Sequence, residues 1–343
     1  MSEPRTGKPS PSRLAAILAG GHGAPSPRVL LGPGAGLDAA VLDLGGRVMA
    51  VAEDPIFPAP GLPLEMMGRF TVHIGASDVA VTGVRPEFMT YTLLLPDGAP
   101  EADAALLVRA ISASAAELGI SIVGGHTGWY GAVNVPLVGG VTVWGFAAPD
   151  AWISPGGARD GDVLLLTKGP AIEAAALLGV LYEPRLQTAL PAEHLRRLRA
   201  RVEQISVVDD ALTAFAAGGV HAMHDATEGG VLGGVWEMHV ASGVPVQVDL
   251  DAVPVPADIQ GLADALGFDA WQAISEGTLL AAVEPAAVEQ VRAAWAERGI
   301  ESHVLGRFRA DLDESRVRRG GVQRPLAEPG EDPFWALFFA GLA

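Results

Sequence analysis

The sequence predicts an α/β (α+β) protein of two domains, and three observations support this fold class. The chain has 343 residues, a length that fits two ordinary domains better than one. Short apolar strands alternate with helical segments in both halves, as they do when helices cover sheets. The segment SPGGARDGD at 154–162 interrupts this pattern, which then restarts. We therefore expect domains at 14–153 and 154–312, with a flexible N-terminal tail at 1–13 and a C-terminal tail at 313–343.

The amino-acid composition disfavours several classes of function. Apolar residues make up 49% of the chain and charged residues 18%, as in a globular protein. The 40 acidic residues outnumber the 23 basic ones, and the net charge of −17 disfavours binding to nucleic acid or to an anionic membrane. The absence of cysteine excludes disulfides, thiolate metal sites and cysteine nucleophiles. Because no apolar segment has the length of a membrane span or a signal peptide, we expect a cytoplasmic protein.

Apolar runs and the glycines that follow them predict the elements of the first half in order. A short helix at 13–20 ends at Gly20–Gly21, and a long helix at 64–83 ends at Gly83. Three strands are expected within 28–55, the last two joined by a hairpin at Gly45–Gly46. The remaining elements are a strand at 87–95, a helix at 102–119, a strand at 120–125, a loop at 126–132 and a strand at 135–147.

The second half repeats the alternation of strands and helices. A strand followed by a helix is expected within 220–243. The apolar segment FWALFFAGLA at 334–343 is too short to cross a bilayer, so we expect it to pack on the core or on a partner subunit. The other elements are strands at 163–169, 244–250, 276–283 and 302–308, and helices at 171–182, 191–204, 207–219, 259–267 and 286–299.

Four aspartates and a glutamate are candidates for chemistry. Asp38 lies in GPGAGLDAAV, Asp54 ends the apolar strand of VMAVAEDP, and Asp225 and Glu228 lie in HDATEGG. Acidic residues among glycines at strand ends suit Mg²⁺, which prefers oxygen ligands and bridges to nucleotide phosphates. Asp78 lies in an apolar helix, where a buried carboxylate needs a partner or a metal.

Several of these residues also have a structural interpretation. Asp54 precedes a proline and suits a turn, and either Asp38 or Asp225 suits the N-cap of a helix. Lys168, in LLLTKGP, neutralises phosphate charge on one interpretation and is a solvated lysine at a strand end on the other. His126, in GGHTG, is a phosphate contact, an acid or base, or a loop residue without a role.

Other kinds of site are poorly supported. The glycine-rich turns at 32–36, 124–128 and 229–234 allow backbone N–H groups to approach a phosphate, but none has the spacing of a Walker A or dinucleotide turn. His221 and His224 lie three residues apart on an expected strand and turn, so they do not share a helix face as zinc ligands. No nucleophile-elbow serine motif is present.

The order of these motifs resembles the AIR synthase (PurM-like) superfamily, and especially its HypE-like branch. The series GPGAGLDAAVLDLGG, AEDPIF, GASDVAVTGVRPEFM, SIVGGHTG, LLLTKG and MHDATEGGV extends over roughly residues 14–310. The resemblance implies a two-domain PurM-like fold, with an N-terminal sheet that forms a dimer and a C-terminal α/β layered domain. It also implies ATP and Mg²⁺ in the cleft between the domains, and phosphorylation of an acceptor oxygen.

The resemblance implies one site that binds a metal ion and a nucleotide. Asp38, Asp54, Asp78 and Asp225 would bind the metal, and catalysis would depend on His126, Lys168 and Asp225. The nucleotide would be held by Gly34, Gly36, Asp38, Asp54, Asp78, Gly125, His126, Thr127, Lys168, Glu228, Gly229 and Gly230.

The chain departs from the family pattern at several positions, so the resemblance does not identify the acceptor molecule. HypE itself carries a C-terminal cysteine that its reaction modifies, and selenide dikinases commonly use a cysteine or selenocysteine near the N-terminus; this chain has neither. Many relatives have an acid at the position of His126, and an acidic pair at Leu37–Asp38, so one metal contact is lost or replaced by water. We expect a homodimeric enzyme with a small-molecule or carboxamide acceptor. The alternatives are a non-catalytic nucleotide-binding scaffold for metallocentre maturation and a kinase of a thiamine-like alcohol.

Overall fold

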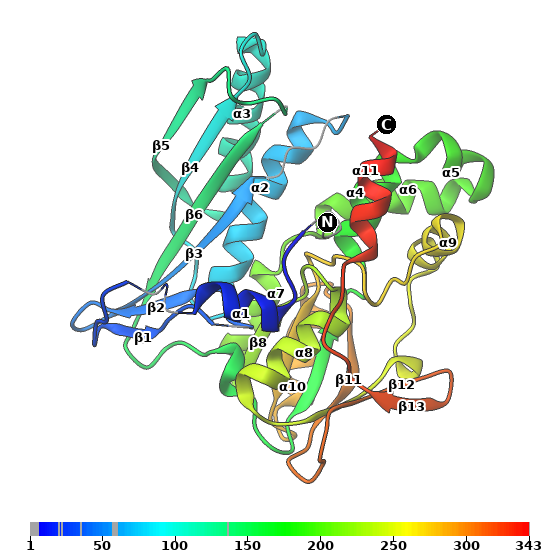
Figure 1. Cartoon of the computed structure of the whole chain (residues 1–343). Helices are drawn as coiled ribbons and strands as arrows, with labels where there is room; N and C mark the ends of the chain where they lie inside the picture. The colour runs from blue at the N-terminus through cyan, green and yellow to red at the C-terminus, as the bar shows by residue number, and fades with distance from the viewer. Residues whose placement is uncertain are drawn as a thin grey trace.

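Two β-sheets, each with helices packed against it, make up the protein (Figure 1). The computed structural model describes residues 7–19, 21, 23–34, 36–56, 61–135 and 137–342. One sheet belongs to the first half of the chain and the other to the second half. The mixed α/β (α+β) fold class expected from the sequence is confirmed.

The first sheet is antiparallel except for one pair of strands at its edge. Its strands are β1 (Val29–Leu31), β2 (Ala40–Asp43), β3 (Val48–Ile56), β4 (Phe88–Leu95), β5 (Ser121–Trp129) and β6 (Val138–Ala147), in the order β1-β2-β3-β6-β4-β5. The edge strand β5 is parallel to β4. Asp43 pairs with Val48 across the β2–β3 hairpin, so the turn predicted at Gly45–Gly46 is confirmed.

Helices of the first half pack on one another and on this sheet. They are α1 (Pro11–Leu18), α2 (Leu64–Ala80) and α3 (Glu101–Leu118). Helix α2 packs on β3, β6 and α3. A Cβ on Gly68 would lie 2.4 Å from the Cβ of Ala110, so the contact between α2 and α3 requires glycine there. Gly119 ends α3 in the left-handed conformation, with φ of 73°.

The second sheet has a buried centre and an exposed hairpin at one edge. Its strands are β7 (Val163–Thr167), β8 (Val220–Asp225), β9 (Val246–Asp249), β10 (Leu279–Val283), β11 (Ser302–Phe308), β12 (Arg316–Arg319) and β13 (Val322–Pro325), in the order β13-β12-β9-β11-β7-β10-β8. Every residue of β7 and β10 is buried, which explains why these strands read as continuous apolar runs.

The described residues of the second half also form eight α-helices. They are α4 (Ile172–Leu181), α5 (Glu183–Ala189), α6 (Ala192–Ala200), α7 (Val208–Ala217), α8 (Gly230–Ser242), α9 (Ala257–Leu266), α10 (Val288–Glu297) and α11 (Pro333–Gly341). Short 3₁₀ turns lie at Pro155–Gly157, Arg201–Gln204 and Leu250–Ala252. Helix α4 is apolar on all sides and almost wholly buried. None of the described helices combines the length and apolarity that crossing a membrane requires.

The structure differs from the predicted elements in three places. The loop expected at 126–132 is wrong, because β5 continues through His126 to Trp129 and pairs with β4 along that length. No strand was expected within the C-terminal tail at 313–343, whereas β12 and β13 lie there; α11 follows them and packs on α4. Helix α5 was not expected at all, and it follows α4 directly.

The two halves share one apolar core where they meet. Helix α2 contacts both α7 and β8 of the second half. A single cluster of buried side chains joins strands of the first sheet, such as Val41 and Val143, to Leu165 of β7 and to Phe334 of α11. The site described next lies at this junction.

Candidate functional site

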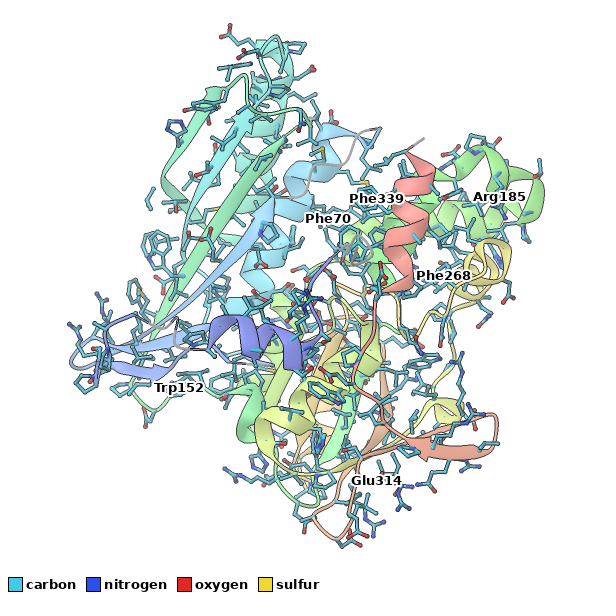
Figure 2. All side chains as sticks on the ribbon, viewed as in Figure 1. Phe70, Trp152, Arg185, Phe268, Glu314 and Phe339 are labelled. Carbon is cyan, nitrogen blue, oxygen red and sulfur yellow. The ribbon has the colours of Figure 1, made fainter. Side chains whose placement is uncertain are left out.

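A cavity of about 710 Å³ lies where the two halves meet. Its wall combines acidic side chains with apolar ones, among them Phe70 of α2, which Figure 2 labels. The lining comes from the N-terminal segment, β3, α2, α4, the β8–α8 connection and α11. Its acidic members are Asp38, Glu53, Asp54, Asp78, Glu173, Glu228, Glu237 and Glu276. A concave, partly apolar pocket with converging polar groups is the common form of a ligand site.

The four predicted metal-binding aspartates come together beside this cavity. Asp54 lies in β3 and Asp78 in α2, which packs on β3, and their carboxyls hydrogen-bond to each other. Asp38 precedes β2, and Asp225 ends β8 of the other half. Burial raises the pKa of Asp38 and of Asp54 to about 6, and burial together with the neighbouring aspartates raises that of Asp78 well above its usual value.

Several oxygens of these carboxylates are buried without a hydrogen bond from any described residue. They are Oδ2 of Asp38, Oδ2 of Asp54 and both carboxyl oxygens of Asp225. A buried carboxylate without a donor is costly, and a divalent cation satisfies several such oxygens at once. The arrangement therefore fits a metal site.

The N-cap interpretation of the aspartates is wrong. Gly229 is the N-cap residue of α8, and no side chain caps that helix. Asp225 lies earlier, at the end of β8, and is completely buried. Asp38 precedes a strand rather than a helix. Neither aspartate satisfies the first turn of a helix, so a structural capping role does not explain them.

His224 lies inside the aspartate cluster. Its Nδ1 is 2.9 Å from Oδ2 of Asp38 and 3.7 Å from Oδ1 of Asp225, while Nε2 is 2.9 Å from Oε2 of Glu237. Burial lowers the pKa of His224, but the surrounding carboxylates outweigh burial and hold it well above its usual value. Burial likewise raises the pKa of Glu237, but His224 and Lys8 outweigh it and lower it to about 2. The spacing of His221 and His224 did not indicate a metal site, yet His224 lies among the aspartates.

Two further acids of the second half face the same cavity. Glu173, in the first turn of α4, and Glu276, before β10, are both buried, and the backbone N–H of Glu276 donates to Oε2 of Glu173. Burial raises the pKa of Glu173 to about 8. Burial and the neighbouring carboxylates Asp225 and Glu173 raise the pKa of Glu276 well above its usual value. Glu173 therefore holds a proton at neutral pH, and the pKa of Glu276 is shifted in the same direction.

The two ends of the chain meet over the β8–α8 connection. The backbone N–H of Lys8 donates to Oε2 of Glu228 at 2.7 Å, and Nε1 of Trp335 donates to the same oxygen at 2.9 Å. Asp332 caps α11 and also accepts from the backbone N–H of Gly229 at 2.8 Å. Glu228 and Gly229, which the sequence predicted as nucleotide contacts, are thus engaged with the chain itself in this structure.

At two of the predicted glycines, the backbone lies so close to a neighbouring segment that a side chain would not fit. Gly36 has φ of 71°, and a Cβ there would lie 2.6 Å from the carbonyl oxygen of Glu237 in α8. Gly230 has φ of 62° and a similarly tight contact with the carbonyl oxygen of Ala273. Gly34 and Gly36 both line the cavity. Gly36 allows the first half to approach α8 of the second half, and Gly230 allows α8 to approach the segment before β10, whatever their role toward a ligand.

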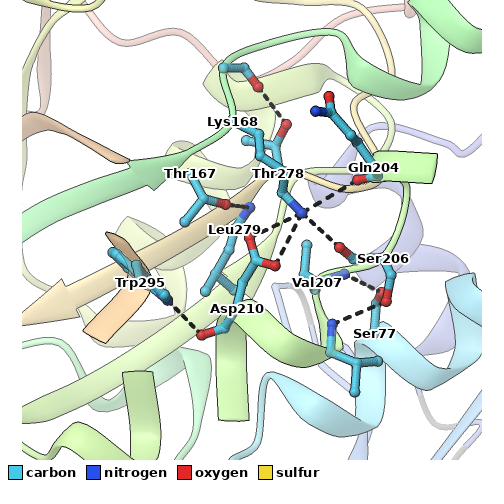
Figure 3. A network of polar contacts seen from close by, with 12 residues as sticks. Ser77, Thr167, Lys168, Gln204, Ser206, Val207, Asp210, Thr278, Leu279 and Trp295 are labelled. Carbon is cyan, nitrogen blue, oxygen red and sulfur yellow. Dashed lines mark hydrogen bonds and ion pairs between the residues drawn. The ribbon is translucent and has the colours of Figure 1, made fainter. Parts of the chain in front are cut away.

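Lys168 lies in a separate polar network (Figure 3). Its ammonium donates to the carbonyl oxygen of Ser206 at 2.7 Å and pairs with Oδ1 of Asp210 at 3.0 Å. Ser77, next to Asp78 in α2, borders this network because its hydroxyl accepts from the N–H of Val207. Lys168 is therefore held by Asp210 and is not among the residues that line the cavity. Its contact with phosphate stays a prediction.

Gly125, His126 and Thr127 lie on the exposed edge strand β5. His126 contacts the hydroxyl of Tyr130, and neither residue belongs to the cavity lining. Within one chain, this part of the expected site is not brought to the aspartates. Its role in binding phosphate also stays a prediction.

Besides His224, four residues of the surroundings were not expected from the sequence: Lys8, Glu173, Glu237 and Glu276. Glu173 and Glu237 lie in apolar helices, and Glu276 lies just before an apolar strand. The signal that selected Asp78, a carboxylate among apolar residues at helical spacing, applies equally to Glu173 in AIEAAALLG and to Glu237 in VWEMHV. Lys8 lies in a Pro- and Ser-rich segment and offers no such signal.

Two family models match most of the chain. They describe the N-terminal domain of AIR synthase related protein, over residues 36–147, and the C-terminal domain of the same protein, over residues 159–318. Carbamoyl dehydratase HypE of Escherichia coli (strain K12) is 31% identical over 292 residues, which cover 82% of this chain and 80% of that protein.

Solved structures of HypE have the same fold. A crystal structure of E. coli HypE aligns with a TM-score of 0.71 and 26% identity over 94% of this chain and 98% of that chain. A crystal structure of hydrogenase maturation protein HypE in complex with ATP aligns with a TM-score of 0.67 and 22% identity over 96% and 98% of the two chains. The protein has the two-domain PurM-like fold and belongs to the AIR synthase related protein family, on its HypE-like branch.

Proposed function

We propose that the protein is a Mg²⁺-dependent, ATP-using enzyme that phosphorylates an oxygen of a small-molecule or carboxamide acceptor. The observation that carries this proposal is the convergence of Asp38, Asp54, Asp78 and Asp225 beside one cavity, with buried oxygens that lack a hydrogen-bond donor among the described residues. The HypE relative is named a carbamoyl dehydratase, and one HypE structure was solved with ATP, which supports chemistry of the same class.

The residues of the cavity fit both the metal and the nucleotide. Carboxylate oxygens are the ligands that Mg²⁺ prefers, and Mg²⁺ bound there would offset the charge of the phosphates. The acidic wall repels a free triphosphate, so nucleotide binding should depend on the cation. The apolar wall, which includes Phe70, Leu177 and Ile274, offers a surface for the base.

Glu173 and Glu276 are the candidates for proton transfer. Burial raises the pKa of Glu173 to about 8 and that of Glu276 well above its usual value, and both line the cavity. A protonated carboxyl donates a hydrogen bond or a proton to an oxygen that develops negative charge or leaves. We therefore assign these two acids to proton transfer with the acceptor.

The proposed acceptor is a separate molecule. The 343 residues include no cysteine whose thiol could be modified as a substrate. Of the acceptors consistent with the family, a carboxamide has the oxygen that phosphorylation turns into a leaving group. We place the reaction in the cytoplasm.

We also propose that the working unit is a homodimer joined through β5. This edge strand is exposed along almost its whole length, with Ile122, Val123 and Trp129 uncovered. An exposed apolar edge strand is prone to pairing with another strand. The arrangement would place His126 and Thr127 at the interface between copies.

The proposed activity is tested by following ATP conversion with candidate acceptors. We expect ADP or AMP to appear with Mg²⁺ and a carboxamide, selenide or ribonucleotide acceptor, and Asp54→Asn to abolish the reaction while the protein stays folded. Binding of ATP without turnover on any of these acceptors would instead favour a nucleotide-binding scaffold. Absence of ATP binding by folded protein would contradict both functions.

A further inference from the structure

His224, Asp38 and Asp225 present three ligand atoms to one point. Nδ1 of His224 is 2.9 Å from Oδ2 of Asp38 and 3.7 Å from Oδ1 of Asp225, and the three atoms lie within 4.8 Å of one another. Ligands held at about 2.1 Å from one ion are separated by about 3.0–3.4 Å in octahedral or tetrahedral geometry. The observed separations bracket this range.

The three ligand atoms are buried. Nδ1 of His224 and Oδ2 of Asp38 lie 2.9 Å apart as an ion pair, so a cation that binds here takes the place of the proton between them. Both oxygens of Asp225 are also buried without a donor among the described residues. His224 is 1% exposed and Asp225 is 0% exposed, so water from bulk solvent does not serve these groups.

Glu237 orients the histidine for metal binding. Its Oε2 is 2.9 Å from Nε2 of His224, with hydrogen-bond geometry. When a cation replaces the proton on Nδ1, the N–H on Nε2 still donates to Glu237 and the lone pair of Nδ1 faces the aspartates. A ligating histidine whose other ring nitrogen donates to a carboxylate is the common second layer of protein metal sites.

We propose that His224, Asp38 and Asp225 form a mixed nitrogen–oxygen site for a first-row transition-metal dication such as Mn²⁺, Fe²⁺, Co²⁺ or Zn²⁺. Imidazole nitrogen favours these ions, whereas Mg²⁺ selects oxygen ligands. Asp54 and Asp78, which hydrogen-bond to each other and have no histidine in the group, form the oxygen-only part of the cluster. The four predicted aspartates thus divide between two cation sites of different chemistry.

Because Asp38 and Asp225 also border the proposed nucleotide cavity, this site is tested on the full chain without ATP. After removal of metal with EDTA, Co²⁺ is titrated and its visible absorption is followed. We expect a Co²⁺ complex that excess Mg²⁺ displaces poorly. His224→Asn should weaken Co²⁺ binding by roughly 100-fold and leave Mg²⁺ binding within about threefold, because it removes the nitrogen ligand and spares the oxygens.

His221→Asn is the matched control. His221 lies on the same strand but contacts Asp162 and Arg159 instead of the cluster. It should bind Co²⁺ as the wild type does. Glu237→Gln keeps a hydrogen-bond acceptor but removes the charge, and should weaken Co²⁺ binding by roughly tenfold. Equal Co²⁺ binding by wild type and folded His224→Asn would overturn the proposal, as would equal affinity of the wild type for Mg²⁺ and Co²⁺.

A second measurement decides the question if His224→Asn does not fold. Mn²⁺ bound to the wild-type protein is examined by pulsed electron paramagnetic resonance. Coupling of the bound Mn²⁺ to a directly ligated ¹⁴N nucleus is the expected result. Bound Mn²⁺ without such coupling would show an oxygen-only site and contradict the proposal. Failure of ATP binding in the separate nucleotide experiments would leave either outcome unaffected.

Discussion

Two buried aspartates of this protein have opposite surroundings. Asp210 pairs with Lys168 and is 3% exposed, whereas Asp225 is 0% exposed and faces Asp38, His224 and Glu276. Removing one member of a buried ion pair leaves the other charge buried without a partner. Removing a charge from an acidic cluster instead reduces the repulsion between its members. The same substitution should therefore have different effects at the two positions.

Asp225→Asn should weaken binding of Mg–ATP by roughly tenfold or more, because it removes one of the carboxylate charges that attract the cation to the cluster. Its thermal stability in EDTA should not fall below that of the wild type. Asp210→Asn is the contrasting variant and should lose roughly 3–5 kcal/mol of stability, because it leaves Lys168 unpaired. Calorimetry and thermal denaturation measure both quantities. A large loss of stability in Asp225→Asn with intact binding would show that this residue is structural.

Glu173 should make the protein less stable as the pH rises. Its pKa is about 8 in the folded protein and 4.5 as the ordinary value, so unfolding releases a proton between these values. The contribution is complete below about pH 4.5, falls by roughly 1.4 kcal/mol per pH unit, and is gone above about pH 8. Urea unfolding in EDTA across this range should show a weaker pH dependence for Glu173→Gln. Parallel curves for the two proteins would contradict the assignment.

The sequence predicted the aspartates of the site but not their full surroundings. Asp38, Asp54 and Asp225 were recognisable because they stand beside glycines or at strand ends, and Asp78 because a charge in an apolar helix needs an explanation. His224 was not recognisable, because its partners lie on β8, on α8 and before β2, and only the tertiary fold brings them together.

At the scale of elements, the buried strands and long helices were predictable and the polar edge was not. β7 and β10 are continuous apolar runs because both of their faces are covered. β12 and β13, with sequences RVRR and VQRP, are largely exposed and carry no apolar alternation. β5 was predicted only in part, since its glycines resemble a turn although it pairs with β4 throughout.

Helix α11 was expected to pack on the core or on a partner, and its buried face lies on the chain's own core. Phe338 is 1% exposed, whereas Phe339 is 49% exposed on the same helix. Phe338→Ala should cost roughly 3–5 kcal/mol, because it leaves a cavity. Phe339→Ala should change stability by about 0.5 kcal/mol or less, as an exposed substitution does. Chemical denaturation of the two variants checks this, and equal effects would mean that α11 does not dock as described.

At the scale of the whole molecule, β5 is the edge through which two copies should join. Val123 is 55% exposed in β5, and a lysine there should block strand pairing. Light scattering should find a dimer for the wild type and a monomer for Val123→Lys. Val240→Lys, at a residue of α8 that is 42% exposed, is the matched control and should remain dimeric. A monomeric wild type, or a dimeric Val123→Lys, would place the interface elsewhere or exclude it.

The acidic cavity is expected to bind ATP through a divalent cation. Isothermal calorimetry of ATP against the full chain, with and without Mg²⁺, measures this binding directly. We predict binding with Mg²⁺, little or none in EDTA, and a loss of the Mg²⁺-dependent binding in Asp54→Asn, because the acidic wall repels a bare triphosphate. Binding of equal strength without a cation, or no binding by folded protein in either condition, would contradict the account.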